Sequence, residues 1–411
     1  MITILCSGSR GDFQPYIALA QQLMKTGRSV RMVGGRSFEA FIRGYGIDYW
    51  PLSADYQTAD IDPGLLQAAQ SSDNPLKMLL TFNKMKHLVT NLTEEMFEAC
   101  RGSEAIVWHP GCSIGWFAAE LLDIPGILAT PFPLHRTREY ASVIAYGKSR
   151  MPVGLSYTLL QQMLWMAGKL GVATVLKKQA NRSRVRFGNP YERVDERHPA
   201  IVSCSPHVFA RPKDWNRHIH MTGYWFVEED TPYVPSDELA HFLNDGEKPV
   251  YFGFGSVFDK ARLDETVDCI TKATKACGRR GIVSGMGDAH GLPDHLLAVG
   301  SLPHSWLFPK VSAVCHHGGA GTAAAGFQAG VPSIIVPFSN DQFAWAHRSH
   351  DLGVGAKPVY RRNLTSNALE AAIRGAHQPD VMHRAAALGR SLSLENGARE
   401  GARVILERLE R

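Results

Sequence analysis

The chain has 411 residues, of which 45% are apolar and 20% charged, so it can form two domains with buried cores. The net charge of +5 is small for this length and the basic residues are scattered, so no nucleic-acid partner is expected. The sequence contains no run of 18 uncharged apolar residues, so no membrane-spanning helix is expected. Seven single cysteines without a CxxC pair, and an N-terminus typical of a strand rather than a signal peptide, favour a reduced, cytoplasmic protein.

Short apolar runs alternate with helix-period segments through the first half of the chain. In order, the predicted elements are a strand at 2–7, a helix at 13–27, strands at 28–34 and 105–109, a helix around 113–122, and strands at 126–131 and 200–205. This alternation is typical of βαβ units and predicts an α/β fold with a parallel, doubly wound sheet.

The middle of the chain, rich in proline, charge and aromatic residues, breaks this alternation, which then restarts. The second series of predicted elements is 249–256, 262–278 (helix), 280–285, 296–303, 312–317, 320–329 (helix) and 333–338. The pattern therefore predicts an N-terminal Rossmann-like domain at 1–215, a linker at 216–236 and a second Rossmann-like domain at 237–395. A terminal helix at 396–411 could cross back to the first domain.

The strongest motif runs from His316 to Gln342 and begins HHGGAGT. Its glycines stand between a predicted strand and an alanine-rich helix, where they would let the backbone approach a phosphate closely. The helix N-terminus offers free N–H groups and the positive end of a dipole, and His317 and Thr322 could add side-chain donors, so a diphosphate is the expected ligand. The alternative is a glycine-rich turn with satisfied histidines.

Asp341 and Gln342 follow in the next strand–helix loop. A carboxylate accepts hydrogen bonds and an amide both donates and accepts, which suits the vicinal hydroxyls of a sugar. The alternative is that Ser339, Asn340 or Asp341 caps the helix near 341–352, which is the simpler interpretation of this loop taken alone.

The loop after the first predicted strand has the sequence GSRGDFQP, from Gly8 to Pro15. It is not a dinucleotide fingerprint, because Arg10 occupies the place of the second glycine in GxGxxG and no acidic residue ends the second strand. An NAD-dependent enzyme is therefore not expected. Asp12 could take a proton from an acceptor hydroxyl, or it could cap a helix that begins near Phe13.

Residues 155–176 are unusually apolar, and five basic residues follow within 177–186. The apolar residues that share one helical face are Leu155, Leu159, Met163, Met166 and Leu170. Two interpretations are open: an acceptor-pocket helix that could make weak peripheral contact with a membrane, or a buried helix followed by a solvated charged segment.

Candidate acceptor-pocket residues also follow strands of the first half, although each taken alone is more often structural. The set comprises Trp108, His109, His135 and, from the apolar helix, Met163. No histidine pair has the spacing of a zinc motif with further ligands nearby, so no metal site is expected.

Four segments together resemble the UDP-glycosyltransferase superfamily, in particular sterol glucosyltransferases and bacterial antibiotic glycosyltransferases. They are GSRGDFQPYIALAQQL, GFGS (253–256), SLPHSWLFPKVSAVCHHGGAGT and GVPSIIVPFSNDQFAWA, in the family's order across nearly the whole chain. The resemblance implies the GT-B fold, with two Rossmann-like domains facing across a cleft. It also implies an inverting, metal-independent transfer of a hexose, in the first place glucose from UDP-glucose, onto a hydroxyl of an apolar acceptor such as a sterol or polyketide.

The resemblance further implies residue roles. Asp12 matches the general base, Leu302 and His304 match the segment that holds the nucleotide base, and Asp341 and Gln342 match the donor-sugar pair. The residues that match the diphosphate site are Ser256, His317, Gly319, Ala320, Gly321 and Thr322. A dTDP-sugar is an alternative donor, because Ser301 stands where plant members place a tryptophan on the uracil. The alternative functions are a non-catalytic nucleotide-sugar-binding partner of another enzyme and a sugar-nucleotide epimerase.

Overall fold

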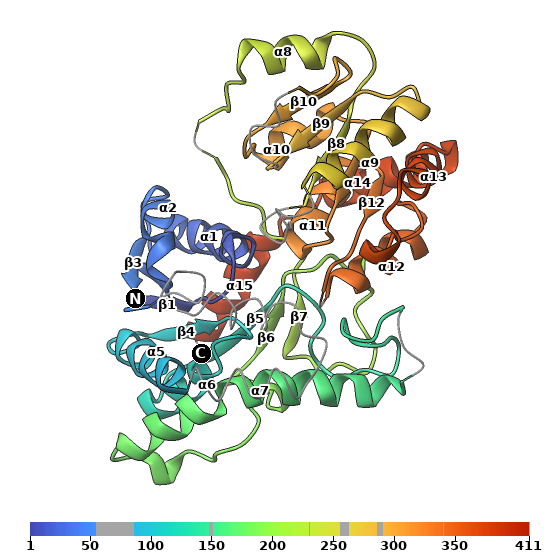
Figure 1. Cartoon of the computed structure of the whole chain (residues 1–411). Coiled ribbons are helices and arrows are strands. Elements are labelled where there is room, and N and C mark those ends of the chain that lie inside the picture. The colour runs from blue at the N-terminus through green and yellow to red at the C-terminus, as the bar shows by residue number, and fades with distance from the viewer. Residues whose placement is uncertain are drawn as a thin grey trace. The chain divides into compact units, whose positions relative to one another are not determined.

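The computed structural model describes residues 1–54, 86–147, 151–229, 231–254, 263–285, 291–339 and 341–410 (Figure 1). The chain divides into two compact units. The first unit contains Met1–Ser142, Met151–Glu228 and Asn396–Arg411, and the second contains Val143–Arg150 and Glu229–Glu395. No helix in the described ranges is long and apolar enough to cross a bilayer.

The first unit is built on a seven-stranded parallel sheet with the order β3-β2-β1-β4-β5-β6-β7. Its strands are β1 (Ile2–Leu5), β2 (Val30–Gly34), β3 (Asp48–Pro51), β4 (Ala105–Trp108), β5 (Gly126–Thr130), β6 (Ala200–Val202) and β7 (Ile219–Met221). The strand order reverses between β1 and β4, and doubly wound sheets bind their ligands at such a switch point. β7 lies within the stretch expected to be a linker, so this sheet extends past residue 215.

The helices of the first unit lie on both faces of the sheet (Figure 1). They are α1 (Arg10–Lys25), α2 (Glu39–Arg43), α5 (Lys86–Ala99), α6 (Ile114–Leu122), α7 (Val153–Lys178) and α15 (Gly397–Leu409), with short 3-10 turns η1 (Arg36–Phe38), η2 (Arg182–Arg184) and η3 (Pro190–Glu192). α1 begins three residues before the predicted start at 13.

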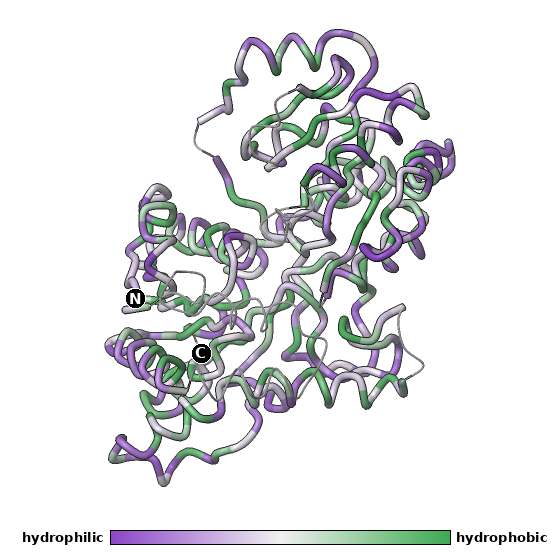
Figure 2. The backbone as a smooth tube through the Cα atoms, in the orientation of Figure 1, coloured by the Kyte–Doolittle hydropathy of each residue, from purple (hydrophilic) through white to green (hydrophobic). Residues whose placement is uncertain are grey.

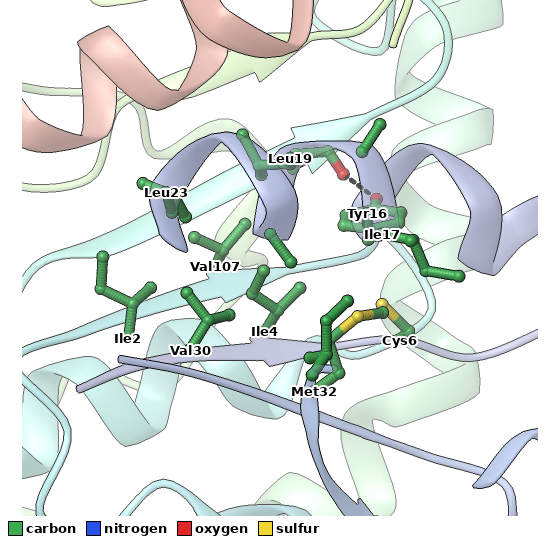
Figure 3. Packing of buried hydrophobic residues seen from close by; sticks show 14 of the residues in the cluster. Ile2, Ile4, Cys6, Tyr16, Ile17, Leu19, Leu23, Val30, Met32 and Val107 are labelled. Atoms are coloured by element: carbon green, nitrogen blue, oxygen red, sulfur yellow. Dashed lines mark hydrogen bonds between the residues drawn. The ribbon is translucent and has the colours of Figure 1, made fainter. Parts of the chain in front are cut away.

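The core of the first unit lies where α1 packs on the central strands (Figure 3). Ile17 and Leu23 of α1 are fully buried over Ile4 of β1 and Val107 of β4. Full burial of one such side chain stabilises the fold by about 1.5–3 kcal/mol. The Tyr16 hydroxyl donates a hydrogen bond to a carbonyl oxygen of β5 at 2.5 Å, which joins α1 to the sheet.

The terminal helix α15 packs on α1 in the core of the first unit. Ala402 and Ile405 are buried in the same core cluster as α1. Gly397 lies so close to the 223–225 backbone that a Cβ there would overlap the carbonyl oxygen of Tyr224 and stand 2.5 Å from the carbonyl carbon of Gly223. The close approach of the last helix to the first unit therefore depends on a residue without a side chain.

The second unit is built on a five-stranded parallel sheet with the order β10-β9-β8-β11-β12, whose switch point lies between β8 and β11. Its strands are β8 (Val250–Gly253), β9 (Gly281–Ser284), β10 (Leu296–Val299), β11 (Ala313–His316) and β12 (Ser333–Ile335). Its helices are α8 (Asp237–Asn244), α9 (Leu263–Ala276), α10 (His304–Leu307), α11 (Ala320–Ala329), α12 (Gln342–Asp351), α13 (Ser366–Ala376) and α14 (Pro379–Leu392), with 3-10 turns η6 (Phe308–Lys310) and η7 (Arg361–Asn363).

Alternate residues of this second sheet enter two separate hydrophobic clusters, one on each face. Phe252 and Cys315 belong to the cluster under α9 and α13, whereas Tyr251 and Val314 belong to the one beside α8 and α10. In Figure 2 the outer helix α8 alternates between hydrophilic and hydrophobic colours, as a helix with one buried face does. The predicted fold, two doubly wound parallel α/β domains, is confirmed.

Candidate active site

The carboxylate of Asp12 is held at the start of α1, directly after β1. Ser9 is the N-cap residue, and both its backbone N–H and its hydroxyl donate to Oδ2 of Asp12, at 2.6 and 2.9 Å. Asp12 is thus the third residue of the helix and completes a capping box. The alternative prediction, that Asp12 caps the helix, is confirmed for the capping role, but the N-cap residue is Ser9 and the helix begins earlier than Phe13. The other oxygen, Oδ1, takes no part in the cap.

His109 lies beside Asp12 because it follows β4, the strand that neighbours β1. The backbone N–H of Gly111 donates to Nδ1 of His109 at 3.0 Å, so in the neutral ring the proton is on Nε2. Nε2 is 3.9 Å from Oδ1 of Asp12. Burial lowers the pKa of His109, and the charge of Asp12 partly opposes this shift. Near pH 7 the ring is therefore neutral and directs an N–H toward the free carboxylate oxygen.

The other three candidate acceptor residues occupy different surroundings. Trp108 is buried in β4 with its ring 5.5 Å from that of Tyr191. His135 is buried edge-on to Trp215, and burial lowers its pKa to about 4. Met163 lies on α7 with its side chain exposed to solvent. Trp108 Nε1 and His135 Nε2 have no hydrogen-bond partner among the described residues.

The loop between β11 and α11 has a conformation that requires glycine. Gly318 has a φ of +93°, and a Cβ there would stand 2.7 Å from Ile335 and 3.0 Å from the carbonyl oxygen of Gln342. Its N–H donates to Nδ1 of the buried His316 at 3.1 Å. α11 begins at Ala320 and ends at Ala329, as predicted.

The N-terminus of α11 presents backbone donors. Gly319 is the N-cap residue and has no side chain to cap the helix, and the first turn contains no acidic residue. Within the described part of the chain, no acceptor is found for the N–H groups of Gly319, Ala320, Gly321 and Thr322. These groups, together with the positive end of the helix dipole, form a site that favours a phosphate.

His317 adds a neutral side chain to this site. Burial lowers its pKa to about 4, so the ring is uncharged near pH 7. Its Nε2 would be 2.6 Å from a Cβ on Gly319, which places the ring at the helix start. His317 Nδ1 and His316 Nε2 are buried without a partner among the described residues, so the alternative of satisfied histidines does not hold.

The predicted base-binding segment lies beside this loop. His304 begins α10 and stacks on Phe308 with ring centroids 4.3 Å apart. Burial lowers the pKa of His316 well below its usual value, and the nearby His317 and His304 add to this shift. Leu302 is partly buried against the core cluster beside α8 and α10. The predicted contact Ser256 lies outside the described residues.

The predicted donor-sugar pair stands at the start of α12. Gln342 uses its side-chain oxygen to accept from the backbone N–H groups of Phe338 (2.8 Å) and Ser339 (3.1 Å). Its amide N–H groups have no acceptor among the described residues. Asp341 occupies the N-cap position but makes no capping bond, and its Oδ2 instead accepts from the Trp345 indole at 2.9 Å. Of the three capping candidates, Asp341 is therefore wrong, whereas Asn340 lies outside the described residues.

The described residues contain no group of three or more His, Cys, Asp or Glu side chains that could hold a metal ion. All seven cysteines are free thiols. The candidate site groups described above are the Asp12–His109 pair in the first unit and the β11–α11 and α12 loops in the second.

Two family models match the chain. The N-terminal domain of glycosyltransferase family 28 matches residues 2–141, and the C-terminal domain of the erythromycin biosynthesis protein CIII-like family matches residues 284–403. The first match contains Asp12 and His109, and the second contains the loops around His317 and Gln342. These matches place the chain in the glycosyltransferase class of enzymes.

Curated relatives align with the whole chain. It is 32% identical over 432 residues to a sterol 3-beta-glucosyltransferase of Yarrowia lipolytica, an alignment that covers 100% of this chain and 29% of the relative. It is 31% identical over 416 residues to a sterol 3-beta-glucosyltransferase of Arabidopsis thaliana, which covers 96% of this chain and 66% of the relative. The chain thus spans less than a third of the fungal relative and about two thirds of the plant one. With these alignments and the two family models, the chain belongs to the glycosyltransferases.

Solved structures show the same fold. The glycotransferase of kitacinnamycin superposes with a TM-score of 0.73 at 17% identity, covering 99% of this chain and 98% of that one. The glycosyltransferase VinC in complex with DTDP superposes with a TM-score of 0.67 at 17% identity, covering 100% and 99%. At such low identity these likenesses define the fold, which is GT-B.

Proposed function

We propose that this chain transfers a hexose from a nucleoside diphosphate sugar onto a hydroxyl of an apolar small-molecule acceptor, with inversion and without a metal. The observation that carries the proposal is the unequal use of the two Asp12 oxygens. Oδ2 is taken up by Ser9, whereas Oδ1 stays outside the capping box and faces His109. A fixed carboxylate with one available oxygen, at a switch point of a doubly wound sheet, is suited to accept a proton.

The donor belongs to the second unit in this proposal. The diphosphate would lie at the N-terminus of α11, where the orphan N–H groups from Gly319 to Thr322 and the neutral ring of His317 can donate. The free amide N–H groups of Gln342 and the carboxylate of Asp341 would take the sugar hydroxyls. The segment from Leu302 to His304 would hold the nucleotide base.

UDP-glucose is the donor that we propose, because the aligned relatives are named glucosyltransferases. A dTDP-sugar is the second choice, since VinC carries DTDP. The first unit, from residue 1 to about 215, would bind the acceptor. A sterol is the first acceptor to test, since the names of the aligned relatives specify it, and other flat apolar alcohols follow.

The reaction would proceed in one displacement. The acceptor hydroxyl gives its proton to Oδ1 of Asp12 while its oxygen forms a bond to the anomeric carbon, and the bond from that carbon to the diphosphate breaks on the opposite face. The charge that develops on the leaving diphosphate meets the N–H groups of α11 and the His317 ring, which can stabilise it in place of a metal. The His109 N–H would hold the Asp12 carboxylate in position. General-base assistance of this kind is worth a factor of about 10²–10⁴.

The test is a transfer assay on purified protein with a panel of UDP- and dTDP-sugars and mixed apolar alcohols, analysed by mass spectrometry with a chelator present. A mass gain of one hexose on any alcohol supports the proposal and identifies both substrates. Tight nucleotide binding without any product supports the non-catalytic alternative. A change of the donor sugar alone, without an acceptor product, supports the epimerase. A strict need for added metal contradicts the metal-free mechanism.

A further inference from the structure

Helix α7 has two apolar faces, of which the core uses one. Its buried face includes Tyr157, Leu160, Trp165 and Val172. The other face is exposed: Leu155 is 47%, Leu159 39%, Met163 43%, Met166 59% and Leu170 39% exposed. The interpretation of residues 155–176 as a buried helix therefore holds for one face of α7 and is wrong for this one. We call these five residues the outer α7 face.

The outer α7 face is one continuous stripe. Its residues follow at intervals of four, four, three and four, which is the spacing of a single side of an α-helix. At 1.5 Å per residue the stripe is about 22 Å long. Scattered exposed apolar residues are ordinary, but a stripe of this length marks an interaction surface.

The segment that carries the stripe has charges of one sign. From Tyr140 to Tyr191 the sequence contains no Asp or Glu. The basic residues on and after the helix are Lys169, Lys177, Lys178, Arg182, Arg184 and Arg186. Lys178 pairs with Glu94 of α5, but no carboxylate among the described residues pairs with Lys177 or Arg184. Helix α7 and the segment after it thus have a net positive charge in sequence, although α5, which packs on α7, contributes Glu94 to one of these basic residues.

We propose that the outer α7 face is a membrane-binding surface that lies in the plane of a bilayer rich in anionic lipid. Leucine and methionine side chains would enter the boundary between headgroups and acyl chains, and the basic residues would meet lipid phosphates. In this proposal α7 lies along the bilayer surface. No described helix is long and apolar enough to span a membrane. Such a surface would bring an apolar acceptor dissolved in the bilayer to the protein.

The charge pattern favours a bilayer over a second copy of this chain. A symmetric dimer through this face would bring two acid-free basic segments together, and their like charges would repel. An anionic membrane surface instead attracts these basic residues. Each basic residue near the surface raises the affinity for the membrane about fivefold.

The test is flotation of the full chain with vesicles of phosphatidylcholine alone or with 30% phosphatidylserine. We expect at least tenfold tighter binding to the anionic vesicles and a loss of this preference at high salt. Leu159→Glu with Met166→Glu should reduce binding at least tenfold, and Lys177→Glu with Arg184→Glu should do the same. Circular dichroism checks that each variant is folded.

Matched controls lie in the second unit. Val234→Glu alters a side chain that is 82% exposed, and Lys357→Glu with Arg390→Glu reverses two exposed charges. Both controls should bind as the wild type does. No preference for anionic vesicles, or equal losses in the controls, would overturn the proposal. The proposal would also be overturned if light scattering shows a dimer that dissociates in Leu159→Glu and the wild type does not bind vesicles.

Vesicle binding is independent of the proposed sugar transfer, so the two ideas can fail separately. Transfer to a water-soluble acceptor should be unchanged in Lys177→Glu with Arg184→Glu, whereas transfer to an acceptor embedded in anionic vesicles should fall at least tenfold. If the wild type binds vesicles but transfers no sugar, the membrane surface stands and the proposed function fails.

Discussion

Oδ1 of Asp12 lies 3.9 Å from Nε2 of His109, although 97 positions separate the two residues in the sequence. Their proximity follows from the sheet, because β1 and β4 are neighbouring parallel strands and both residues come after the carboxyl ends of these strands. Ser9 fixes the carboxylate and Gly111 fixes the imidazole tautomer. Backbone N–H groups of Ser9 and Gly111 thus hold the carboxylate and the imidazole in their relative orientation.

This arrangement predicts the titration of His109. The negative charge of Asp12 raises the pKa of His109 against the larger lowering effect of burial. Asp12→Asn removes that charge, so the pKa of His109 should fall further. Long-range ¹H–¹⁵N spectra of the histidine rings, assigned with His109→Gln, measure both this shift and the tautomer. A proton on Nδ1, or an unchanged or higher pKa in Asp12→Asn, would contradict the geometry.

Gly319→Ala should weaken nucleotide binding. The new Cβ would stand 2.6 Å from Nε2 of His317 and force the ring away from the start of α11. We expect the dissociation constant for UDP or dTDP to rise by about tenfold or more. The His317 ring would be a misplaced hydrogen-bond donor, and the crowded N-terminus of α11 would hold a phosphate less well. Isothermal titration calorimetry measures the change.

Gly375→Ala in α13 is the matched control, because the nearest atom to its new Cβ is 3.8 Å away. It should leave the affinity unchanged. Equal affinities of Gly319→Ala and the wild type would remove the α11 N-terminus from the donor site.

The buried His135 should make the protein sensitive to acid. Burial lowers its pKa to about 4, so the folded state binds its proton less readily than the unfolded chain does. This contribution to stability is present above the unfolded pKa, near 6.5, and is lost as the pH falls toward 4. Between pH 7 and pH 5 the loss amounts to about 2 kcal/mol.

His135→Phe should therefore show a smaller loss of unfolding free energy between pH 7 and pH 5 than the wild type. Urea unfolding followed by tryptophan fluorescence at the two pH values measures it. His350→Phe, at an exposed position of α12, serves as the control. If His135→Phe keeps the full pH dependence, His135 is not the source of it.

Gly397→Ala should loosen the terminal helix. Its Cβ would overlap the Tyr224 carbonyl oxygen, and because the neighbour is backbone the clash cannot be relieved by a side-chain rotation. We expect a loss of about 1–3 kcal/mol of stability in the first unit. Thermal and urea unfolding test this, with Gly375→Ala as the control. Unchanged stability would mean that α15 does not need this close approach.

Much of the fold was predictable, because its signals are local. α11 has the predicted bounds, since Gly319 and Gly330 mark its two ends and alanine favours helix between them. The glycines of HHGGAGT likewise indicated a tight loop before α11. β7 was missed because three residues flanked by proline and charge give little periodicity, and only pairing with β6 makes them a strand.

The site was less predictable where it depends on long-range contacts. The start of α1 is a separate, local error, because the spacing of Ser9 and Asp12 is that of a capping box and indicates the earlier start. The pairing of Asp12 with His109 depends on the strand order, which no local pattern gives. The exposed face of α7 was open to two interpretations, because a helix that is apolar all round is usually buried.

The most direct test of the central claim compares initial rates of hexose transfer by the wild type and Asp12→Asn, with nucleotide affinity measured in parallel. The substrates are the pair that the transfer assay identifies, and Asp264→Asn, at an exposed position of α9, is the control. We predict that Asp12→Asn lowers the rate by about 10²–10⁴-fold while UDP or dTDP affinity stays within twofold and the control matches the wild type. A rate within threefold of the wild type, or a rate loss matched by an equal loss of nucleotide affinity, would contradict the assignment of Asp12 as the base.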